Sequence, residues 1–230
     1  MLNIDKITTI KKGKISFDFD NIAIVVKQRD VVGNILQEWL QGWLVHNGIE
    51  FSTNNNTQMP PDFFLDTTNH KESLLEVKAF NYNASPGFDI ADFKMYENEL
   101  ISKPWMIYVD YLIFGYDMSN TGIVTIKKIW LKKVWEITAA SSDWPLKLQV
   151  KRNVVHKLRP CKFFSSNSKF PVFKNESDFL SALEQTIYQN PDTHSDAGTW
   201  RIRFRKAYKC EYGKEITIPR WEDIKDKYVH

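Results

Sequence analysis

Apolar and polar positions near the start of the chain predict a hairpin followed by a helix. Ile15–Phe19 and Ile22–Val26 have the composition of short strands, and Asp20-Asn21 between them has the chemistry of a turn. From Val31 to Val45 the apolar positions recur at i, i+1, i+4, i+5, i+8 and i+9, which predicts one helical face. Gly48 is then expected to end this helix.

The rest of the chain alternates between strand-like and helix-like patterns. A polar turn separates two apolar segments that predict a β-hairpin, Phe63–Leu65 and Leu74–Phe80. Helical spacing predicts a helix over Ile90–Ile101, which Lys103-Pro104 stops. The remaining predicted elements are strands at Ile49–Phe51, Trp105–Tyr116 and Ile123–Thr138 and a helix at Phe179–Tyr188.

This order of elements predicts an α/β fold with a mixed central sheet flanked by helices on both faces. No shift in composition marks a boundary, so we expect a single domain over residues 1–230. Within it we expect a core at about 30–138, followed by a basic elaboration at about 139–230.

Composition narrows the class of protein. The chain has 230 residues, of which 43% are hydrophobic and 26% charged, and these are ordinary globular values. No apolar run reaches the roughly 18 residues of a membrane span, and the first residues lack the apolar stretch of a signal peptide. Two cysteines are too few for a disulfide scaffold, so we expect a cytoplasmic protein that does not enter a membrane.

The net charge of +3 hides an asymmetry between the two halves. Residues 1–115 carry 10 Lys+Arg against 15 Asp+Glu, whereas residues 116–230 carry 21 against 13. An acidic half beside a basic half suggests a metal on one side and a polyanion on the other, although a solvated basic face gives the same counts.

One group of residues carries recognisable chemistry. Asp62 follows Pro61, and after thirteen intervening residues comes Glu76-Val77-Lys78 within an apolar strand. Because strand side chains alternate, Glu76 and Lys78 project to the same face, and both are costly to bury without partners. If Asp62 lies on the neighbouring strand, two carboxylates and a lysine meet.

Such a set fits metal-dependent hydrolysis of a phosphodiester. Magnesium prefers hard oxygen ligands, which the carboxylates of Asp62 and Glu76 and the backbone carbonyl of Val77 would supply. Lys78 would orient or deprotonate the attacking water, or stabilise the charge on phosphorus; the sequence leaves both roles open. The alternative is a structural ion pair between Glu76 and Lys78 beside an unrelated Pro-Asp turn.

These residues resemble the motif of the PD-(D/E)XK nuclease superfamily, and specifically that of type II restriction endonucleases. The match covers about residues 29–80, including the helix that such folds place before the catalytic hairpin. The chain as a whole also resembles the NgoBV group of endonucleases. The resemblance implies a restriction-endonuclease-like fold, Mg²⁺, double-stranded DNA and a bacterial homodimer whose two sites cut opposite strands.

Other carboxylates are weaker candidates for the metal. Some members of the superfamily add an acidic residue from the first helix, where Glu38 is available. Glu38 lies roughly opposite the apolar stripe on a helical wheel, which favours a solvated side chain over a ligand. Asp66 and Asp89 are spare, and Asp89 is equally well explained as the N-cap of the next helix.

Two basic stretches suit contact with nucleic acid. Leu146–Pro160 interleaves apolar residues with side chains that read bases and grip phosphates: Lys147, Gln149, Lys151, Arg152, Asn153, Lys157 and Arg159. Trp200–Arg205 alternates strictly, which predicts a strand with an aromatic face and an arginine ladder, Arg201, Arg203 and Arg205. A solvated sheet face is the alternative for both.

The leading hypothesis is therefore a type II restriction endonuclease that hydrolyses double-stranded DNA at a specific site with Mg²⁺. Three alternatives remain open: a repair or structure-selective nuclease with the same chemistry, a non-catalytic DNA-binding protein, and a globular domain with a basic face.

Overall fold

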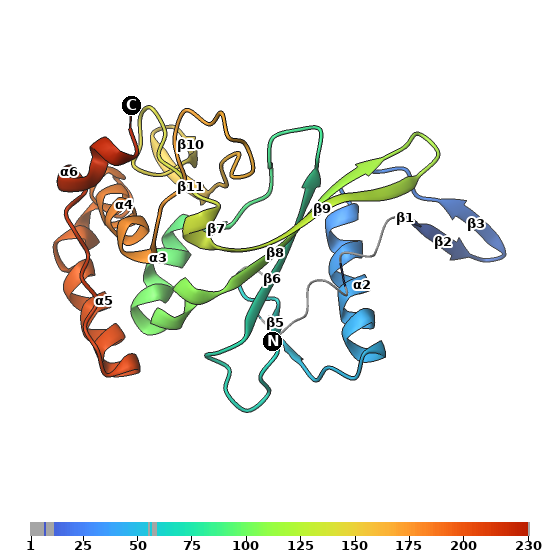
Figure 1. Ribbon diagram of the computed structural model, residues 1–230, viewed down its shortest axis with the longest axis horizontal. Coiled ribbons are helices and arrows are strands. Elements are labelled where there is room, and N and C mark those ends of the chain that lie inside the picture. The colour runs from blue at the N-terminus through green and yellow to red at the C-terminus, as the bar shows by residue number, and fades with distance from the viewer. Residues whose placement is uncertain (1–6, 8–11, 55, 57–58, 230) are drawn as a thin grey trace. The chain divides into compact units, whose positions relative to one another are not determined.

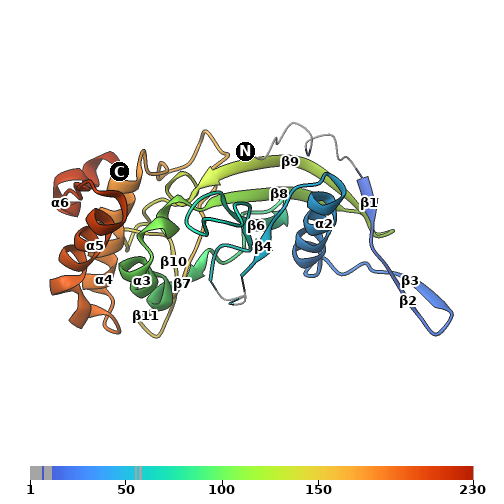
Figure 2. The same ribbon diagram turned by 90° about the horizontal axis from the view of Figure 1, so that it is seen from below.

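A computed structural model describes residues 7, 12–54, 56 and 59–229. The chain divides into two compact units (Figures 1 and 2). The sheet unit comprises Met1–Thr53, Asp62–Phe88 and Asp110–Lys132, and the helical unit comprises Asn54–Pro61, Asp89–Val109 and Lys133–His230. That the two units together form the single endonuclease domain expected from the sequence stays a prediction. Across the described residues, no helix is both long enough and apolar enough to span a membrane.

A six-stranded mixed sheet forms the centre of the sheet unit (Figure 1). Its order is β1 (Lys12–Lys14), β9 (Ile123–Lys133), β8 (Asp110–Met118), β6 (Leu74–Asn81), β5 (Phe63–Phe64) and β4 (Ser52–Thr53). β6 and β8 run parallel from Leu75↔Asp110 to Asn81↔Tyr116, whereas β5 pairs antiparallel with both β4 and β6. The β5–β6 pair confirms the hairpin predicted at Phe63–Leu65 and Leu74–Phe80.

Helix α2 (Val32–His46) covers one face of this sheet and confirms the helix predicted at Val31–Val45. The buried side chains of Leu40 and Leu44 pack in one cluster with residues of β5, β6 and β8: Phe63, Leu75, Val77, Leu112 and Phe114. Gly48 follows the helix with a φ of +65°, a conformation that glycine adopts without steric cost, and so it ends the helix as expected. Because α2 packs on the side of Leu75 and Val77, the alternate residues Glu76 and Lys78 project to the opposite face.

Strands β2 (Ser16–Phe19) and β3 (Ile22–Val25) form a separate two-stranded ribbon in the sheet unit. Asp20 and Asn21 join them with φ of +46° and +66°, the two positive values that a type I′ turn requires. The hairpin expected from the sequence is therefore confirmed.

The helical unit combines helices with a small sheet of order β10-β11-β7. Its strands are β7 (Ala91–Asp92), β10 (Leu148–Lys151) and β11 (Val154–Leu158), and its α-helices are α3 (Phe93–Ser102), α4 (Glu176–Gln189), α5 (Ala197–Tyr212) and α6 (Trp221–Ile224). Short 3₁₀ helices lie at Pro104–Tyr108, Val134–Glu136, His194–Asp196 and Lys225–Lys227. α4 confirms the helix predicted at Phe179–Tyr188.

The strand predicted at Trp200–Arg205 is wrong, because these residues lie within helix α5. Trp200, Phe204 and Tyr208 are all buried, and their spacing of four residues places them on one helical face. Phe204 packs against both neighbours, with ring centroids 5.3 Å from Trp200 and 6.1 Å from Tyr208. Ile202, which a strand would bury, is 69% exposed.

Four element boundaries also differ from the prediction. The segment expected to begin a strand at Trp105 forms the 3₁₀ helix Pro104–Tyr108, and β8 starts only at Asp110. Pro104 favours this helical turn because its fixed φ suits a first helical position. β9 ends at Lys133 rather than Thr138, and the short strand expected at Ile49–Phe51 lies instead at Ser52–Thr53. Helix α3 begins at Phe93 rather than Ile90, because Asp92 accepts a hydrogen bond from the Met95 N–H and caps the helix.

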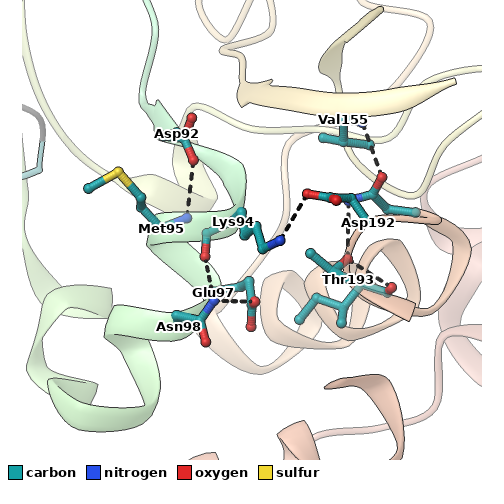
Figure 3. Close-up of polar contacts among 10 residues, drawn as sticks. Asp92, Lys94, Met95, Glu97, Asn98, Val155, Asp192 and Thr193 are labelled. Atoms are coloured by element: carbon teal, nitrogen blue, oxygen red, sulfur yellow. Dashed lines mark hydrogen bonds and ion pairs between the residues drawn. The ribbon is translucent and has the colours of Figure 1, made fainter. Parts of the chain in front are cut away.

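A polar network joins helix α4 to β11 in the helical unit (Figure 3). The buried side chain of Asn190 accepts from the Val155 N–H at 3.1 Å and donates to the Thr193 hydroxyl at 3.1 Å. Thr193 in turn donates to the Ile187 carbonyl at 3.0 Å. Beside them, Lys94 of α3 forms an ion pair with Asp192 at 3.1 Å between half-exposed side chains.

Asn190→Ala is expected to destabilise the protein by about 1–3 kcal/mol, because it leaves the buried Val155 N–H without its acceptor. Asp192→Ala removes only an exposed ion pair and should cost at most about 1 kcal/mol. Urea denaturation of both variants measures the difference. Equal midpoints for the two variants would contradict a special role for Asn190.

Candidate active site

Three chemical groups of the sheet unit converge where β5 begins beside β6. Asp62 directly precedes β5, and Phe63 of β5 pairs with Leu75 of β6. This register brings the Asp62 carboxylate to the backbone of β6 next to Glu76 and Lys78. The structure therefore brings together the three residues that the sequence proposed as catalytic.

The Asp62 carboxylate is held by two donors. Its Oδ2 accepts from the Val77 backbone N–H at 2.7 Å, and its Oδ1 accepts from the Gln37 side-chain amide of helix α2 at 2.9 Å. Burial raises the pKa of Asp62, whereas the Val77 N–H, the positive charge of Lys78 and the Gln37 amide each oppose the rise. These contacts fix the direction of the carboxylate relative to β6.

The Glu76 carboxylate is almost completely buried, with 5% of the residue exposed. Its Oε1 forms an ion pair with the Lys78 ammonium at 2.6 Å, and its buried Oε2 has no hydrogen-bond partner among the described residues. Burial raises the pKa of Glu76 to about 7; the positive charge of Lys78 opposes this rise and the nearby Asp62 carboxylate adds to it. A lone pair on a buried, anionic oxygen is costly unless a cation approaches it.

The oxygen atoms at this point suit a small divalent cation. In a β-strand the N–H and C=O of one residue point to the same edge of the strand, and those of the next residue point to the other edge. The Val77 carbonyl therefore lies on the edge of β6 whose N–H binds Asp62. Strand β5 does not pair with this part of that edge. Two carboxylates and one carbonyl are hard ligands of the kind that Mg²⁺ accepts while it keeps several waters. No cluster of three or more His, Cys, Asp or Glu suited to a metal occurs in the described part of the chain.

The other carboxylates considered from the sequence lie in different surroundings. Glu38 is exposed on α2, as expected for a solvated side chain. Asp66 accepts from the backbone N–H groups of Thr68 and Asn69, both at 2.9 Å, and so stabilises its own turn. Asp89 forms an ion pair with Arg159 at 2.6 Å and does not cap α3, so that prediction is wrong.

Gln37 is the residue of this site that sequence reasoning missed. It is neither acidic nor part of the apolar stripe of α2, so neither charge nor periodicity distinguishes it. Its position beside Glu38, the acidic candidate on the same helix, was the available signal.

The basic stretch at Leu146–Pro160 folds into the hairpin β10–β11 of the helical unit. Arg152 and Asn153 form its turn, with φ of +52° and +62°, and both are exposed together with Lys151. Lys157 and Arg159 instead form ion pairs within the unit, with Asp92 at 3.4 Å and with Asp89. Lys147 and Gln149 are half-buried.

The three arginines of the expected ladder do not share one face of a strand. In helix α5, Arg201 pairs with Glu184 and Arg205 with Glu215 at 3.4 Å, whereas Arg203 is exposed. Two of the three arginines therefore have carboxylates of the protein itself as partners, so the predicted ladder does not support a contact with DNA. Their contact with DNA stays a prediction without this support.

Comparisons with known proteins agree over nearly the whole chain. The model of the NgoBV restriction endonuclease family matches residues 1–228. The type II restriction enzyme NlaIV of Neisseria lactamica is 56% identical over 229 residues, which cover 99% of this chain and 94% of the relative. The type II restriction enzyme NgoBV of Neisseria gonorrhoeae is 51% identical over 152 residues, or 66% of this chain and 86% of the relative.

The solved structure of the NlaIV restriction endonuclease superposes with a TM-score of 0.94 at 55% identity, covering 98% of this chain and 93% of that one. A mixed sheet that carries this pair of carboxylates, together with these matches, defines a type II restriction endonuclease. The chain belongs to the NgoBV restriction endonuclease family. The resemblance and the fold class inferred from the sequence are thereby confirmed.

Glu76 is expected to make the metal-free protein less stable at alkaline pH. Its pKa is about 7 in the folded chain against an ordinary value of 4.5, so the folded state binds more protons between these values. Stability therefore falls as the pH rises from 4.5 to 7 and stays reduced above it. Glu76→Gln, which is always neutral, should be more stable than the wild type at pH 8 by on the order of 3 kcal/mol.

Denaturation in EDTA at pH 4 and pH 8 measures this difference, which should disappear at the lower pH. Glu38→Gln is the matched control that replaces an exposed carboxylate, and as a surface substitution it should change stability by at most about 0.5 kcal/mol. A gain for Glu76→Gln that is the same at both pH values would refute the assignment to ionisation.

Proposed function

We propose that Asp62, Glu76 and Lys78 are the catalytic residues for Mg²⁺-dependent hydrolysis of phosphodiester bonds in double-stranded DNA. The observation that carries the proposal is the convergence of the buried Glu76 carboxylate, the half-buried Asp62 carboxylate and the Lys78 ammonium beside β6, with the Glu76 Oε2 left without a partner among the described residues. A purely structural ion pair would not need the Asp62 carboxylate directed at the same strand.

Each residue has a distinct task in this proposal. Asp62, Glu76 and the Val77 carbonyl would hold Mg²⁺, which when bound lowers the pKa of a coordinated water and neutralises charge on the phosphate. The two donors to Asp62 hold its carboxylate in position before any ligand arrives. The Lys78 ammonium partly neutralises Glu76 in the metal-free protein, and this ion pair makes the burial of the carboxylate tolerable.

The position of Lys78 is compatible with both of its candidate roles. Its side chain is 20% exposed, so the ammonium lies at the border between the buried carboxylate and solvent. From there it would stabilise charge on the scissile phosphate or act on the attacking water.

DNA contacts are proposed for the basic residues of the helical unit. Lys151, Arg152 and Asn153 at the exposed β10–β11 turn have the side chains that bind phosphates and base edges. The further candidates are those expected from the sequence: Lys147, Gln149, Lys157, Arg159, Arg201, Arg203 and Arg205. A homodimer is proposed because one site cuts one strand, and two sites related by a two-fold axis would cut both strands of a duplex. The cytoplasmic location stays a prediction.

Asp62→Ala and Glu76→Ala are each expected to abolish cleavage of plasmid or phage DNA in Mg²⁺, because each removes a proposed metal ligand. DNA binding in EDTA should remain close to that of the wild type. Gel electrophoresis of the products and gel shifts measure the two properties, with Glu38→Ala as the control that removes an exposed carboxylate of α2. Discrete fragments from either site variant would disprove the assignment.

Gln37→Ala is expected to slow cleavage by about 10–100-fold and to raise the Mg²⁺ concentration needed for half-maximal rate, because Asp62 loses a donor that orients it. Asn34→Ala, which changes an exposed amide on the same helix, should cleave normally. Calorimetric titration with Mn²⁺ gives a readout independent of turnover. An unchanged metal affinity for Gln37→Ala would show that Gln37 does not position Asp62.

A further inference from the structure

An aromatic group lies on the face of the six-stranded sheet to which Glu76 and Lys78 project, which we call the site face. Phe80 follows Lys78 by two positions on β6, so its side chain projects to the site face as well. On β8, Gly115 pairs with Phe80, whereas its neighbour Phe114 belongs to the cluster under α2. Gly115 is therefore the point where β8 is bare on the site face.

Trp130 of β9 packs flat over this bare point. Its ring stacks on Phe80, with centroids 5.7 Å apart, and on Tyr82, with centroids 6.2 Å apart, and both interplanar angles are 21°. A Cβ at Gly115 would lie 2.9 Å from both the Trp130 and the Tyr82 ring, which is too close. Glycine weakens the interior of a strand, but it suits a position where another group approaches the backbone closely. Gly115 thus makes the seat of Trp130 possible.

Lys128 lies over the ring that is seated in this way. It precedes Trp130 by two positions on β9, and its ammonium is 5.6 Å from the centroid of the Trp130 ring. This distance is within the range of a cation–π contact. Lys128 is exposed and forms no ion pair with any described residue. Its charge is thus held on the site face and is free to meet an external anion.

The chemistry of this group favours a phosphate over a base. Trp130 is 9% exposed and Phe80 is 4% exposed, so neither ring has an open face on which a DNA base could stack. What the group offers to solvent is the ammonium of Lys128, a point charge that binds phosphate oxygens.

Strand spacing fixes how far this ammonium lies from the proposed catalytic residues. β9 is separated from β6 by β8, and two strand spacings amount to roughly 10 Å (Figure 1). One strand of DNA rises about 3.4 Å per nucleotide, so this separation corresponds to about three nucleotides. A DNA strand whose scissile phosphate lies at Glu76 and Lys78 would therefore bring a neighbouring phosphate to Lys128.

We propose that Lys128 binds a backbone phosphate that flanks the scissile phosphate, and that Trp130 is a positioning residue that holds the Lys128 ammonium on the site face. The contact aligns the cleaved strand with the site and carries no sequence information. The ring also restricts the lysine side chain before DNA arrives, which lowers the entropy lost on binding. The proposal rests on the proposed function, because Asp62, Glu76 and Lys78 define where the scissile phosphate lies.

The first test is the salt dependence of DNA binding by the full chain, measured in EDTA so that no cleavage occurs. Lys128→Ala should weaken binding about 10-fold at low salt and reduce the slope of log K against log[salt] by about 0.9, the value of one lost phosphate contact. Lys128→Arg keeps the charge and should keep the slope. Lys227→Ala, which removes an exposed lysine of the 3₁₀ helix Lys225–Lys227, is the control and should bind as the wild type does. An unchanged slope for Lys128→Ala overturns the proposal.

A duplex with a single neutral methylphosphonate linkage locates the contact. The linkage is placed in turn at about four positions on each side of the cleaved bond, which is mapped by sequencing the ends of cut plasmid. At a flanking position the neutral linkage should weaken wild-type binding about 10-fold and leave Lys128→Ala unaffected, because that variant has already lost the contact. Equal losses for both proteins at every position overturn the proposal.

Trp130→Leu tests the positioning role, because it keeps Lys128 but removes the ring beneath its ammonium. Its salt slope should fall towards that of Lys128→Ala, whereas Trp130→Phe, which keeps an aromatic face, should recover most of the slope. Circular dichroism checks that both variants are folded. If Trp130→Leu has the same effect on binding in the Lys128→Ala background as in the wild type, Trp130 does not act through Lys128 and the positioning role is overturned.

The outcomes separate this proposal from the proposed function. Cleavage that Asp62→Ala abolishes, together with an unchanged salt slope for Lys128→Ala, leaves the nuclease site intact and overturns the phosphate contact. A reduced slope with a loss at one flanking linkage, in a protein whose Asp62→Ala variant still cuts, upholds the contact while the proposed function fails.

Discussion

The burial of the Glu76 carboxylate beside Asp62 is the constraint on which the site depends. Two carboxylates placed near each other inside a protein repel, and burial disfavours the charge of each. The fold compensates with one ammonium, one backbone N–H and one side-chain amide, from Lys78, Val77 and Gln37. The compensation is incomplete, because the pKa of Glu76 still rises to about 7 and its second oxygen is unsatisfied within the described chain. A cation would complete it.

Strand geometry makes this arrangement possible at low cost to the core. Along β6 the odd positions, Leu75 and Val77, enter the apolar cluster under α2, while the even positions, Glu76 and Lys78, lie on the other face. A single strand therefore serves both the packing of the sheet and the chemistry. Because β5 begins only at Phe63, the edge of β6 beside Val77 is left for the Asp62 carboxylate rather than for another strand residue. The late start of β5 thus leaves room for the site in the sheet.

Much of this architecture was predictable because local patterns and the fold agree. The amphipathic repeat of α2, the Asp20-Asn21 turn and the β5–β6 hairpin each have one dominant local signal. Helix α5 was missed because Trp200, Ile202 and Phe204 imitate a strand over six residues, and only the longer repeat through Tyr208 reveals the helix. The spacing of Asp62, Glu76 and Lys78 predicted their convergence. Gln37 contacts Asp62 from helix α2, a different element, so no local sequence pattern predicts this hydrogen bond.

Ion pairs within the helical unit reduce the positive charge that the charge asymmetry of the sequence suggests. Several basic side chains of the helical unit are already paired with carboxylates, as Arg159 is with Asp89 and Arg201 with Glu184. A count of lysines and arginines therefore overstates the positive charge that an external polyanion would meet. Within the described residues, Lys151 and Arg152 have no ion pair and lie exposed at one tight turn. A rigid turn presents such groups without the entropic cost of ordering a loop, so a small number of unpaired cations at β10–β11 is better suited to selective contact than a broad basic face.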